Sequence, residues 1–134
     1  MDFITARQNL IDGQLRPNRV TDDVVLARFS SLPREKFTSH EHAALAYADG
    51  PVPQGHGRVM MSPLALARLV QALALKPQDR LLVLGAGTGF SVALTAPLVA
   101  QVIAVEDNAY LADSGKRLVA DQHISNVKWV VGTP

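Results

Sequence analysis

The sequence contains no cysteine, so it can form neither disulfides nor thiolate metal sites, which fits a reducing compartment. Positive and negative charges nearly balance, because the sequence has 13 Lys and Arg residues and 12 Asp and Glu residues, for a net charge of +1. The basic residues are scattered and form no stripe, which argues against a nucleic-acid partner. No apolar run is long enough for a signal peptide or a membrane span. We therefore expect a cytoplasmic protein without a membrane partner.

Apolar residues make up 48% of the 134 residues, enough for the core of one compact domain. The pattern predicts a helical and loop segment over 1–60 that packs on a β-α-β-α-β half over 61–134. The expected elements are a helix at 2–15, a helix capped by Thr21, a short helix from Ser39 to Ala46, an irregular loop at 47–59, a helix from Ser62-Pro63 to about Ala74, strands at 81–84, 101–105 and 127–131, and helices at 90–98 and 109–121.

The most informative segment joins an expected strand to an expected helix. Its four apolar residues, 81–84, indicate a strand buried on both faces, and three glycines follow at alternate positions. Glycines at such a turn let the backbone approach a ligand closely, and the helix N-terminus offers N–H groups. The pattern predicts a nucleotide-like ligand at Gly85, Ala86, Gly87, Thr88, Gly89 and Phe90.

The glycine spacing narrows the choice of ligand. A dinucleotide fingerprint has the form G-x-G-x-x-G, whereas this loop has the shorter G-x-G-x-G, with Phe90 where the third glycine would stand. The shorter loop suits a ligand without a pyrophosphate, for which S-adenosylmethionine is the candidate. Glu106 and Asp107 follow the next expected strand, about 20 positions after the first glycine, Gly85. A carboxylate there can accept hydrogen bonds from ribose hydroxyls. Glu106 is the better placed of the two.

Alternating strands and helices predict parallel strands joined by right-handed crossovers. In the sheet we expect the 101–105 strand between the 127–131 strand and the 81–84 strand. The 81–84 strand then lies at an edge, although it is the most uniformly apolar of the three. Such a strand favours neighbours on both sides. Either a partner chain covers this strand or, as we expect, the chain is a fragment and the remaining half of the sheet follows Pro134.

Several segments resemble the protein-L-isoaspartate O-methyltransferase family, which has the Rossmann-like class I fold of S-adenosylmethionine-dependent methyltransferases. The sequence LPREKF at 32–37 resembles that family's VPREXF segment, and AYADGPVP at 46–53 resembles AYxDxPLP. The segment from Gly57 to Pro63 is found where the family has GQTISQP, and Asn126 to Gly132 resembles its NV…GD strand. The resemblance spans nearly the whole chain and implies an α/β fold.

The resemblance also shows where the chain departs from the family pattern. Met61 stands at the position of the family's serine, and Ser62 takes the place of the second glutamine. Val83 stands where the first strand usually carries an acidic residue, and Thr133 replaces the aspartate after the last glycine. These departures motivate an alternative, a non-catalytic module that binds S-adenosylmethionine. A methyltransferase with a different substrate and a nicotinamide-dependent dehydrogenase are further alternatives, although the glycine spacing argues against the latter.

The resemblance implies transfer of a methyl group to the free carboxylate of isoaspartyl residues in damaged proteins or peptides. A carboxylate with a pKa of about 4 is ionised at neutral pH, so the reaction needs no general base. Ser62 is the candidate catalytic residue, as a hydrogen-bond donor to the substrate carboxylate, although its sequence context also suits a helix N-cap. His40-Glu41-His42 lacks a third ligand at metal-binding spacing, so we expect no metal site.

Overall fold

The computed structural model describes residues 1–134 and divides them into two compact units, Met1–Ala74 and Leu75–Pro134. The helix that follows Ser62 belongs to the first unit, whereas the sequence-based division grouped it with the sheet. None of the helices combines the length and the apolar character that a membrane span requires.

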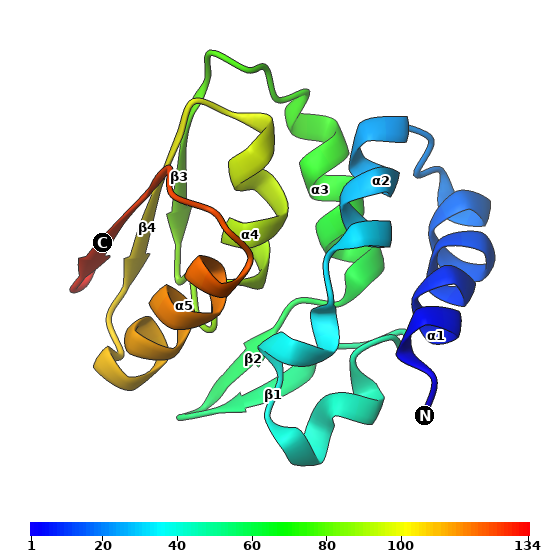
Figure 1. Ribbon diagram of the computed structural model, residues 1–134, viewed down its shortest axis with the longest axis horizontal. Helices are drawn as coiled ribbons and strands as arrows, with labels where there is room; N and C mark the ends of the chain where they lie inside the picture. The colour runs from blue at the N-terminus through cyan, green and yellow to red at the C-terminus, as the bar shows by residue number, and fades with distance from the viewer. The chain divides into compact units, whose positions relative to one another are not determined.

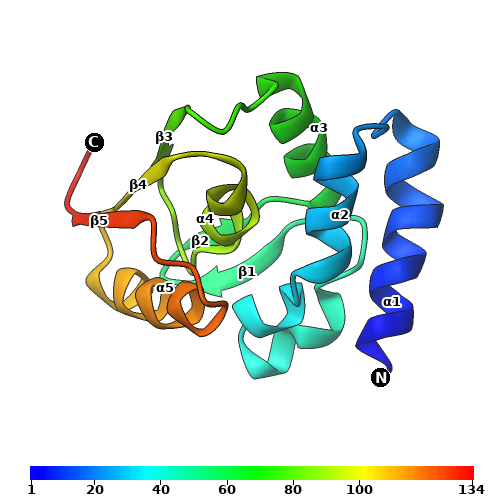
Figure 2. The same ribbon diagram turned by 45° about the horizontal axis from the view of Figure 1, so that its top comes forward.

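The first unit contains three α-helices. They are α1 (Phe3–Leu10), α2 (Asp23–Ser31) and α3 (Pro63–Leu73). Both views show α1 beside α2 (Figures 1 and 2). Shorter helical turns connect them, namely η1 (Ile11–Leu15), η2 (Arg16–Asn18), η3 (Arg34–Phe37) and η4 (His40–Leu45). Burial of apolar residues on the helix faces, such as Leu10, Leu26 and Phe29, favours this arrangement.

The starts of these helices follow from their caps. The Asp2 carboxylate accepts hydrogen bonds from the amides of Ile4 and Thr5, and Ser62 with Pro63 begins α3 as expected. The prediction that Thr21 caps the second helix is wrong, because the neighbouring Asp22 carboxylate accepts from the first amides of α2 instead. Aspartate caps at least as well as threonine, so two adjacent candidates compete and the sequence alone does not decide between them.

The helix expected over 2–15 is present, with a change of type near its end. Residues Ile11–Leu15 form a π-helical turn, η1, which contains Gly13. A π turn is wider than an α turn and shifts the side chains that follow it. Gln14 lies in this turn, and its side-chain amide donates to the carbonyl of Tyr47 at 3.0 Å.

The segment 47–59 is not the irregular loop that its glycines and prolines predicted. It contains an antiparallel hairpin of β1 (Val52–Gly55) and β2 (Arg58–Met60). The turn places Gly55, His56 and Gly57 at φ angles of 80°, 56° and 72°, a left-handed conformation that glycine adopts without strain. Short strands rich in glycine and proline carry no clear alternation, so the hairpin was missed.

The second unit is a parallel sheet with helical crossovers. Its strands are β3 (Arg80–Leu84), β4 (Gln101–Glu106) and β5 (Val127–Val131), with β4 in the middle, which confirms the expected order and direction. The crossovers are α4 (Phe90–Thr95) with the short turn η5 (Ala96–Leu98), and α5 (Ala109–Asp121). Figure 1 shows both helices on the same side of the sheet.

The two faces of this sheet differ in burial. Val102 and Ala104 of β4 point to the covered face and are fully buried. Leu82, Leu84 and Val130 share the opposite face, and each is at least 40% exposed. The expectation that strand 81–84 is buried on both faces is therefore wrong for this chain, because β3 has one neighbour and alternate residues point to the open face.

Trp129 packs where α5 and the glycine-rich loop come together. A Cβ atom added to Gly115 of α5 would lie 2.5 Å from Cη2 of Trp129 and 3.1 Å from the carbonyl oxygen of Gly87. Gly89 faces the same ring, at 3.4 Å from an added Cβ. The absence of side chains at these two glycines therefore makes room for the indole, which packs against the loop.

We predict that Gly115→Ala destabilises the protein, although alanine favours a helix by about 1 kcal/mol over glycine. Overpacking against Trp129 and the Gly87 carbonyl costs about 1–3 kcal/mol, so the net effect is a loss. In a Trp129→Val background the indole is gone and only the contact with the Gly87 carbonyl remains, so Gly115→Ala is expected to cost less. Urea denaturation of the four proteins in the cycle measures this coupling. An equal cost in both backgrounds would contradict the packing account.

Candidate functional site

The glycine-rich loop is closed against the carboxyl end of β4. The amides of Gly85 and Ala86 both donate to the carbonyl of Val105, at 2.9 and 3.1 Å. Gly85, Gly87 and Gly89 have φ angles of 69°, 59° and 91°, and Gly89 caps α4. Because a side chain strains a left-handed backbone, this alternating conformation explains why glycine stands at all three positions.

A single carboxylate joins the loop to the next strand and helix. Glu106 ends β4 and is fully buried. Its Oε1 accepts from the amide of Gly87 at 2.7 Å, and its Oε2 accepts from the amide of Asn108 at 2.8 Å. Short hydrogen bonds of this kind compensate a buried negative charge. We call Glu106 with these two amides the carboxylate clamp.

The carboxylate clamp extends into α5. Asn108 is the N-cap of that helix, and its side-chain oxygen accepts from the amide of Leu111 at 3.0 Å. One side chain, Glu106, therefore sets the positions of the loop before α4 and of the residue that begins α5. Both helix starts lie at the carboxyl ends of parallel strands, where α/β proteins bind their ligands.

The structure brings the predicted loop residues and Glu106 together within the second unit. Ala86, Gly87, Gly89 and Phe90 are buried, Thr88 is half-buried, and Gly85 is exposed. Asp107 is exposed beside the carboxylate clamp. Ser62, the predicted catalytic residue, lies in the first unit, where its hydroxyl accepts from the amide of Ala65 at 3.4 Å as the N-cap of α3.

Near Ser62 the first unit holds a network of polar side chains that sequence reasoning missed. Arg7 donates to the hydroxyl of Tyr47 at 2.9 Å and to Glu35 at 3.0 Å, and that hydroxyl donates to Glu35. The backbone amide of Arg34 donates to the same hydroxyl at 3.1 Å. We call Arg7, Gln14, Arg34, Glu35 and Tyr47 the polar clasp. Its members come from distant parts of the chain. The only signal for Arg34, Glu35 and Tyr47 was their place in the family-like segments, and Arg7 and Gln14 lie outside those segments.

Arg34 is the most deeply buried charge of the polar clasp, at 1% exposure. Its Nε donates to the carbonyl of Ala46 at 2.7 Å, and its Nη2 donates to the carbonyl of Met61 at 2.8 Å. Burial lowers the pKa of Arg34 to about 10, so the guanidinium stays charged at neutral pH. Burial, followed by the hydrogen bond to Glu35, raises the pKa of Tyr47 to about 12, so the phenol stays protonated.

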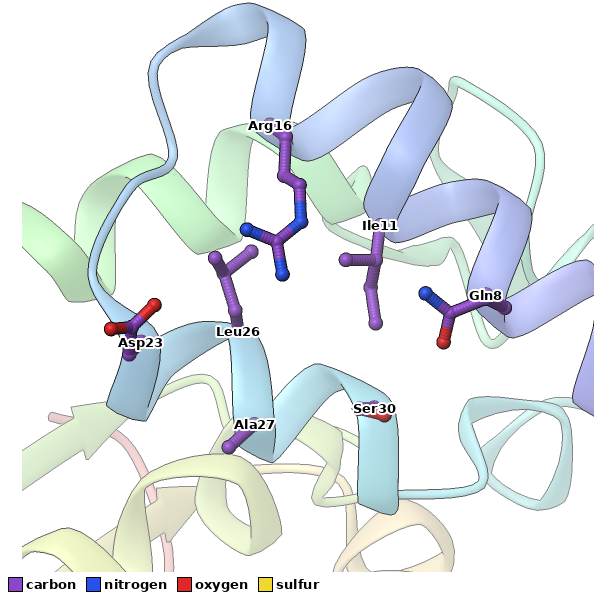
Figure 3. A pocket seen from close by; sticks show the side chains of 7 residues that line it. All are labelled: Gln8, Ile11, Arg16, Asp23, Leu26, Ala27 and Ser30. Atoms are coloured by element: carbon purple, nitrogen blue, oxygen red, sulfur yellow. The ribbon is translucent and has the colours of Figure 1, made fainter.

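A surface pocket of about 240 Å³ lies between the α1–η1 helix and α2 (Figure 3). Ile11, Leu26 and Ala27 form its apolar lining, and Arg16 points into it. The Arg16 guanidinium and the Gln8 amide both contact the carboxylate of Asp12. The lining contains one positive side chain, Arg16, which is already paired with Asp12, and one negative side chain, Asp23. The lining therefore favours neither a negatively nor a positively charged ligand.

Potential metal ligands are not clustered in this chain. No group of three or more His, Asp or Glu side chains is arranged to hold a metal ion. In the turn that contains His40, Glu41 and His42, Nδ1 of His42 lies 2.8 Å from the hydroxyl of Ser39.

The fold and the loop define the class to which this chain belongs. A solved protein-L-isoaspartate O-methyltransferase superposes with a TM-score of 0.81 at 24% identity, over 95% of this chain and 42% of that one. A Plasmodium falciparum structure, described as a candidate member of the same family in complex with S-adenosyl-L-homocysteine, gives a TM-score of 0.75 at 21% identity, over 97% of this chain and 62% of that one. The chain therefore has the Rossmann-like fold of the class I methyltransferases.

The sequence comparison identifies the family within that class. The model of the protein-L-isoaspartate(D-aspartate) O-methyltransferase family matches residues 5–133. The chain belongs to this family. Among similar proteins, the protein-L-isoaspartate O-methyltransferase of Methylorubrum populi is 37% identical over 86% of this chain, and that of Rhodopseudomonas palustris is 34% identical over 94%. The chain spans about half the length of these relatives, 54% and 51% respectively.

The raised pKa of Tyr47 predicts a pH dependence of stability. In the unfolded chain the phenol titrates near 10.0, and in the folded protein near 12. The folded state therefore binds this proton more tightly, and the corresponding stability, fully present below pH 10, is lost as pH rises from 10 to 12. We expect the wild type to lose free energy of unfolding relative to Tyr47→Phe across this window. Urea denaturation at several pH values measures it, with Tyr110→Phe as the matched control at an exposed position. A difference that stays constant with pH would contradict the burial of this phenol in the polar clasp.

Proposed function

We propose that the protein is an S-adenosylmethionine-dependent O-methyltransferase that methylates the free carboxylate of isoaspartyl residues in damaged proteins or peptides of the cytoplasm. The observation that carries this proposal is the carboxylate clamp. It holds a glycine-rich loop at the carboxyl ends of two parallel strands, where a nucleoside would lie. Family membership supplies the reaction and the substrate class.

The residues at the loop fit an adenosyl group. Gly85 and Gly87 carry no side chain in the left-handed loop, so a ligand can approach the backbone there, whereas the missing side chain of Gly89 makes room for Val119 and Trp129. A carboxylate oxygen can accept two hydrogen bonds, so Glu106 can accept ribose hydroxyls in addition to the amides that it already binds. The solved Plasmodium falciparum neighbour contains S-adenosyl-L-homocysteine, which supports the same class of ligand here.

When bound, S-adenosylmethionine supplies a methyl group activated by the neighbouring sulfonium. The substrate carboxylate is ionised at neutral pH, so no side chain has to remove a proton. The protein's contribution is then to orient the two reactants and to exclude water. The chain accordingly needs no paired nucleophile and base, and the described site contains none.

Ser62 is our candidate for orienting the substrate carboxylate. Its oxygen accepts from the Ala65 amide, while its own proton can be donated to another acceptor. A serine at the first turn of α3 also benefits from the partial positive charge of the helix N-terminus, which favours a carboxylate nearby. Ser62 would therefore hold the substrate and take no part in bond making.

A second candidate function is a module that binds S-adenosylmethionine without transferring its methyl group. It is favoured by Met61, which is 46% exposed directly before Ser62, where the resemblance calls for a serine hydroxyl. Val83 and Thr133 are further positions at which a polar group of the family pattern is absent. Cofactor binding without methyl transfer by the protein in its native full length would favour this alternative.

We predict that Glu106→Gln weakens binding of S-adenosylmethionine by about 10- to 100-fold, because an amide replaces a charged acceptor worth about 1.5–3 kcal/mol. Isothermal titration calorimetry measures the affinity. Methyl transfer to an isoaspartyl peptide, with the normal aspartyl peptide as substrate control, measures the activity. The wild type is expected to methylate the isoaspartyl peptide only.

Asp113→Asn is the matched control, since it removes an exposed carboxylate of α5 outside the carboxylate clamp. It should leave the affinity unchanged. Glu106→Asp keeps the charge and should bind more tightly than Glu106→Gln if the fold is intact, which a thermal melt checks. Equal affinities of wild type and Glu106→Gln would refute the role of Glu106, and tighter binding of NAD than of S-adenosylmethionine would refute the proposed cofactor.

A further inference from the structure

We propose that Arg34 is a positioning residue that sets the orientation of Ser62 and, through it, the affinity for the isoaspartyl carboxylate. The proposal rests on the proposed function for its substrate and on the geometry of the polar clasp for its mechanism. Arg34 comes from η3, and the carbonyls that it binds belong to Ala46 and Met61, on either side of the β1–β2 hairpin.

The guanidinium joins the two backbone segments that flank the hairpin. Ala46 precedes the hairpin and Met61 follows it, so Arg34 holds the chain where it enters and where it leaves β1–β2. Gln14 reinforces the first of these points, because its amide donates to the carbonyl of Tyr47. The hairpin is thus anchored at its base by side chains from η1 and η3.

The bond to Met61 also fixes the residue that follows it. The carbonyl of Met61 and the amide of Ser62 belong to one planar peptide, and no peptide in this chain is cis. Holding the carbonyl oxygen toward Arg34 therefore directs the Ser62 amide to the opposite side. It also sets the position of the Ser62 Cα, from which the hydroxyl and the first turn of α3 follow.

The position requires arginine in particular. The planar guanidinium presents N–H groups in a rigid fork, and here Nε and Nη2 reach two separate carbonyls. A lysine presents its three N–H donors from one nitrogen on a flexible stem, so it lacks the two separate, rigidly held nitrogens that bind these carbonyls here. The hydroxyl of Tyr47 accepts from the Arg34 backbone amide and so holds η3 in place for this contact.

Arg34 itself is fully buried and binds backbone carbonyls, so we infer that it acts on the substrate only through Ser62. A contact that Ser62 makes equally in the ground state and the transition state affects KM and leaves kcat unchanged. Loss of the Arg34 bond to Met61 should therefore raise KM for the isoaspartyl peptide. It should not alter the affinity for S-adenosylmethionine, whose proposed contacts lie in the second unit.

The test compares Arg34→Lys with wild type in the protein at its native full length. We expect KM for an isoaspartyl peptide to rise about tenfold, as for loss of one hydrogen bond of about 1.4 kcal/mol, with kcat within about twofold. The calorimetric affinity for S-adenosylmethionine should stay the same. Hydrogen exchange measured by mass spectrometry should become at least several-fold faster in peptides that cover 60–66. Arg16→Lys, at an exposed ion pair, is the matched control and should change none of these quantities.

Two outcomes would overturn the proposal. One is unchanged hydrogen exchange over 60–66 in a folded Arg34→Lys protein. The other is a loss of kcat in proportion to the folded fraction with KM unaltered, which is what a merely structural role produces. If Arg34→Lys does not fold, Tyr47→Phe tests the same idea, because it removes the acceptor of the Arg34 amide and keeps the ring. It should then raise KM in the same direction, and an unchanged KM would contradict the proposal.

The exchange measurement separates this inference from the proposed function. If the wild type methylates no isoaspartyl peptide, the proposed function fails, yet faster exchange at 60–66 in Arg34→Lys would still show that Arg34 orders Ser62. If the wild type is active and the exchange is unchanged, the role of Arg34 fails and the proposed function stands.

Discussion

The second unit depends on one buried carboxylate. Glu106 is removed from water, and its charge is compensated by backbone amides of Gly87 and Asn108. An unpaired buried charge would be strongly destabilising, so the two hydrogen bonds favour this conformation of the loop and of the start of α5. The three left-handed glycines and the close packing of Gly115 on Trp129 also contribute, because they allow the loop to approach Glu106 closely enough for the hydrogen bond from the Gly87 amide.

The first unit also contains a buried charge that is compensated by backbone groups, but there the charge is positive. There a buried cation, Arg34, donates to backbone carbonyls, whereas in the second unit a buried anion accepts from backbone amides. In each unit one ionised side chain fixes segments that carry no regular secondary structure. This division matches the proposed roles, since the carboxylate clamp would position the cofactor and the polar clasp would position the residue that meets the substrate.

Much of the second unit could be predicted from the sequence because its signals are local. Apolar runs followed by glycines or by Asn108 mark strand ends and helix starts within a few residues. The parallel order β3-β4-β5 follows from the alternation of strands and helices. The prediction that β3 is buried on both faces was wrong. A uniformly apolar strand favours burial, but the sequence does not show whether anything covers both of its faces in this chain.

The first unit was harder to predict, for the opposite reason. The polar clasp joins residues as distant as Arg7 and Tyr47, and nothing near either residue indicates the other. The family-like segments contain Arg34, Glu35 and Tyr47 but not Arg7, and they do not indicate which atoms are in contact. The choice of Asp22 over Thr21 as a cap could not be predicted, because the two signals are of similar strength. The hairpin that begins at Val52 could not be predicted either, because its short strands show no clear alternation.

A structure of the native full-length protein with S-adenosyl-L-homocysteine tests the central claim most directly. The account predicts that the adenosyl group lies over Gly85–Gly89, with its ribose hydroxyls on the Glu106 carboxylate and the amides of Gly87 and Asn108 still bound to it. A ligand bound elsewhere, or no ligand over Gly85–Gly89 at saturating ligand concentration, would contradict the account.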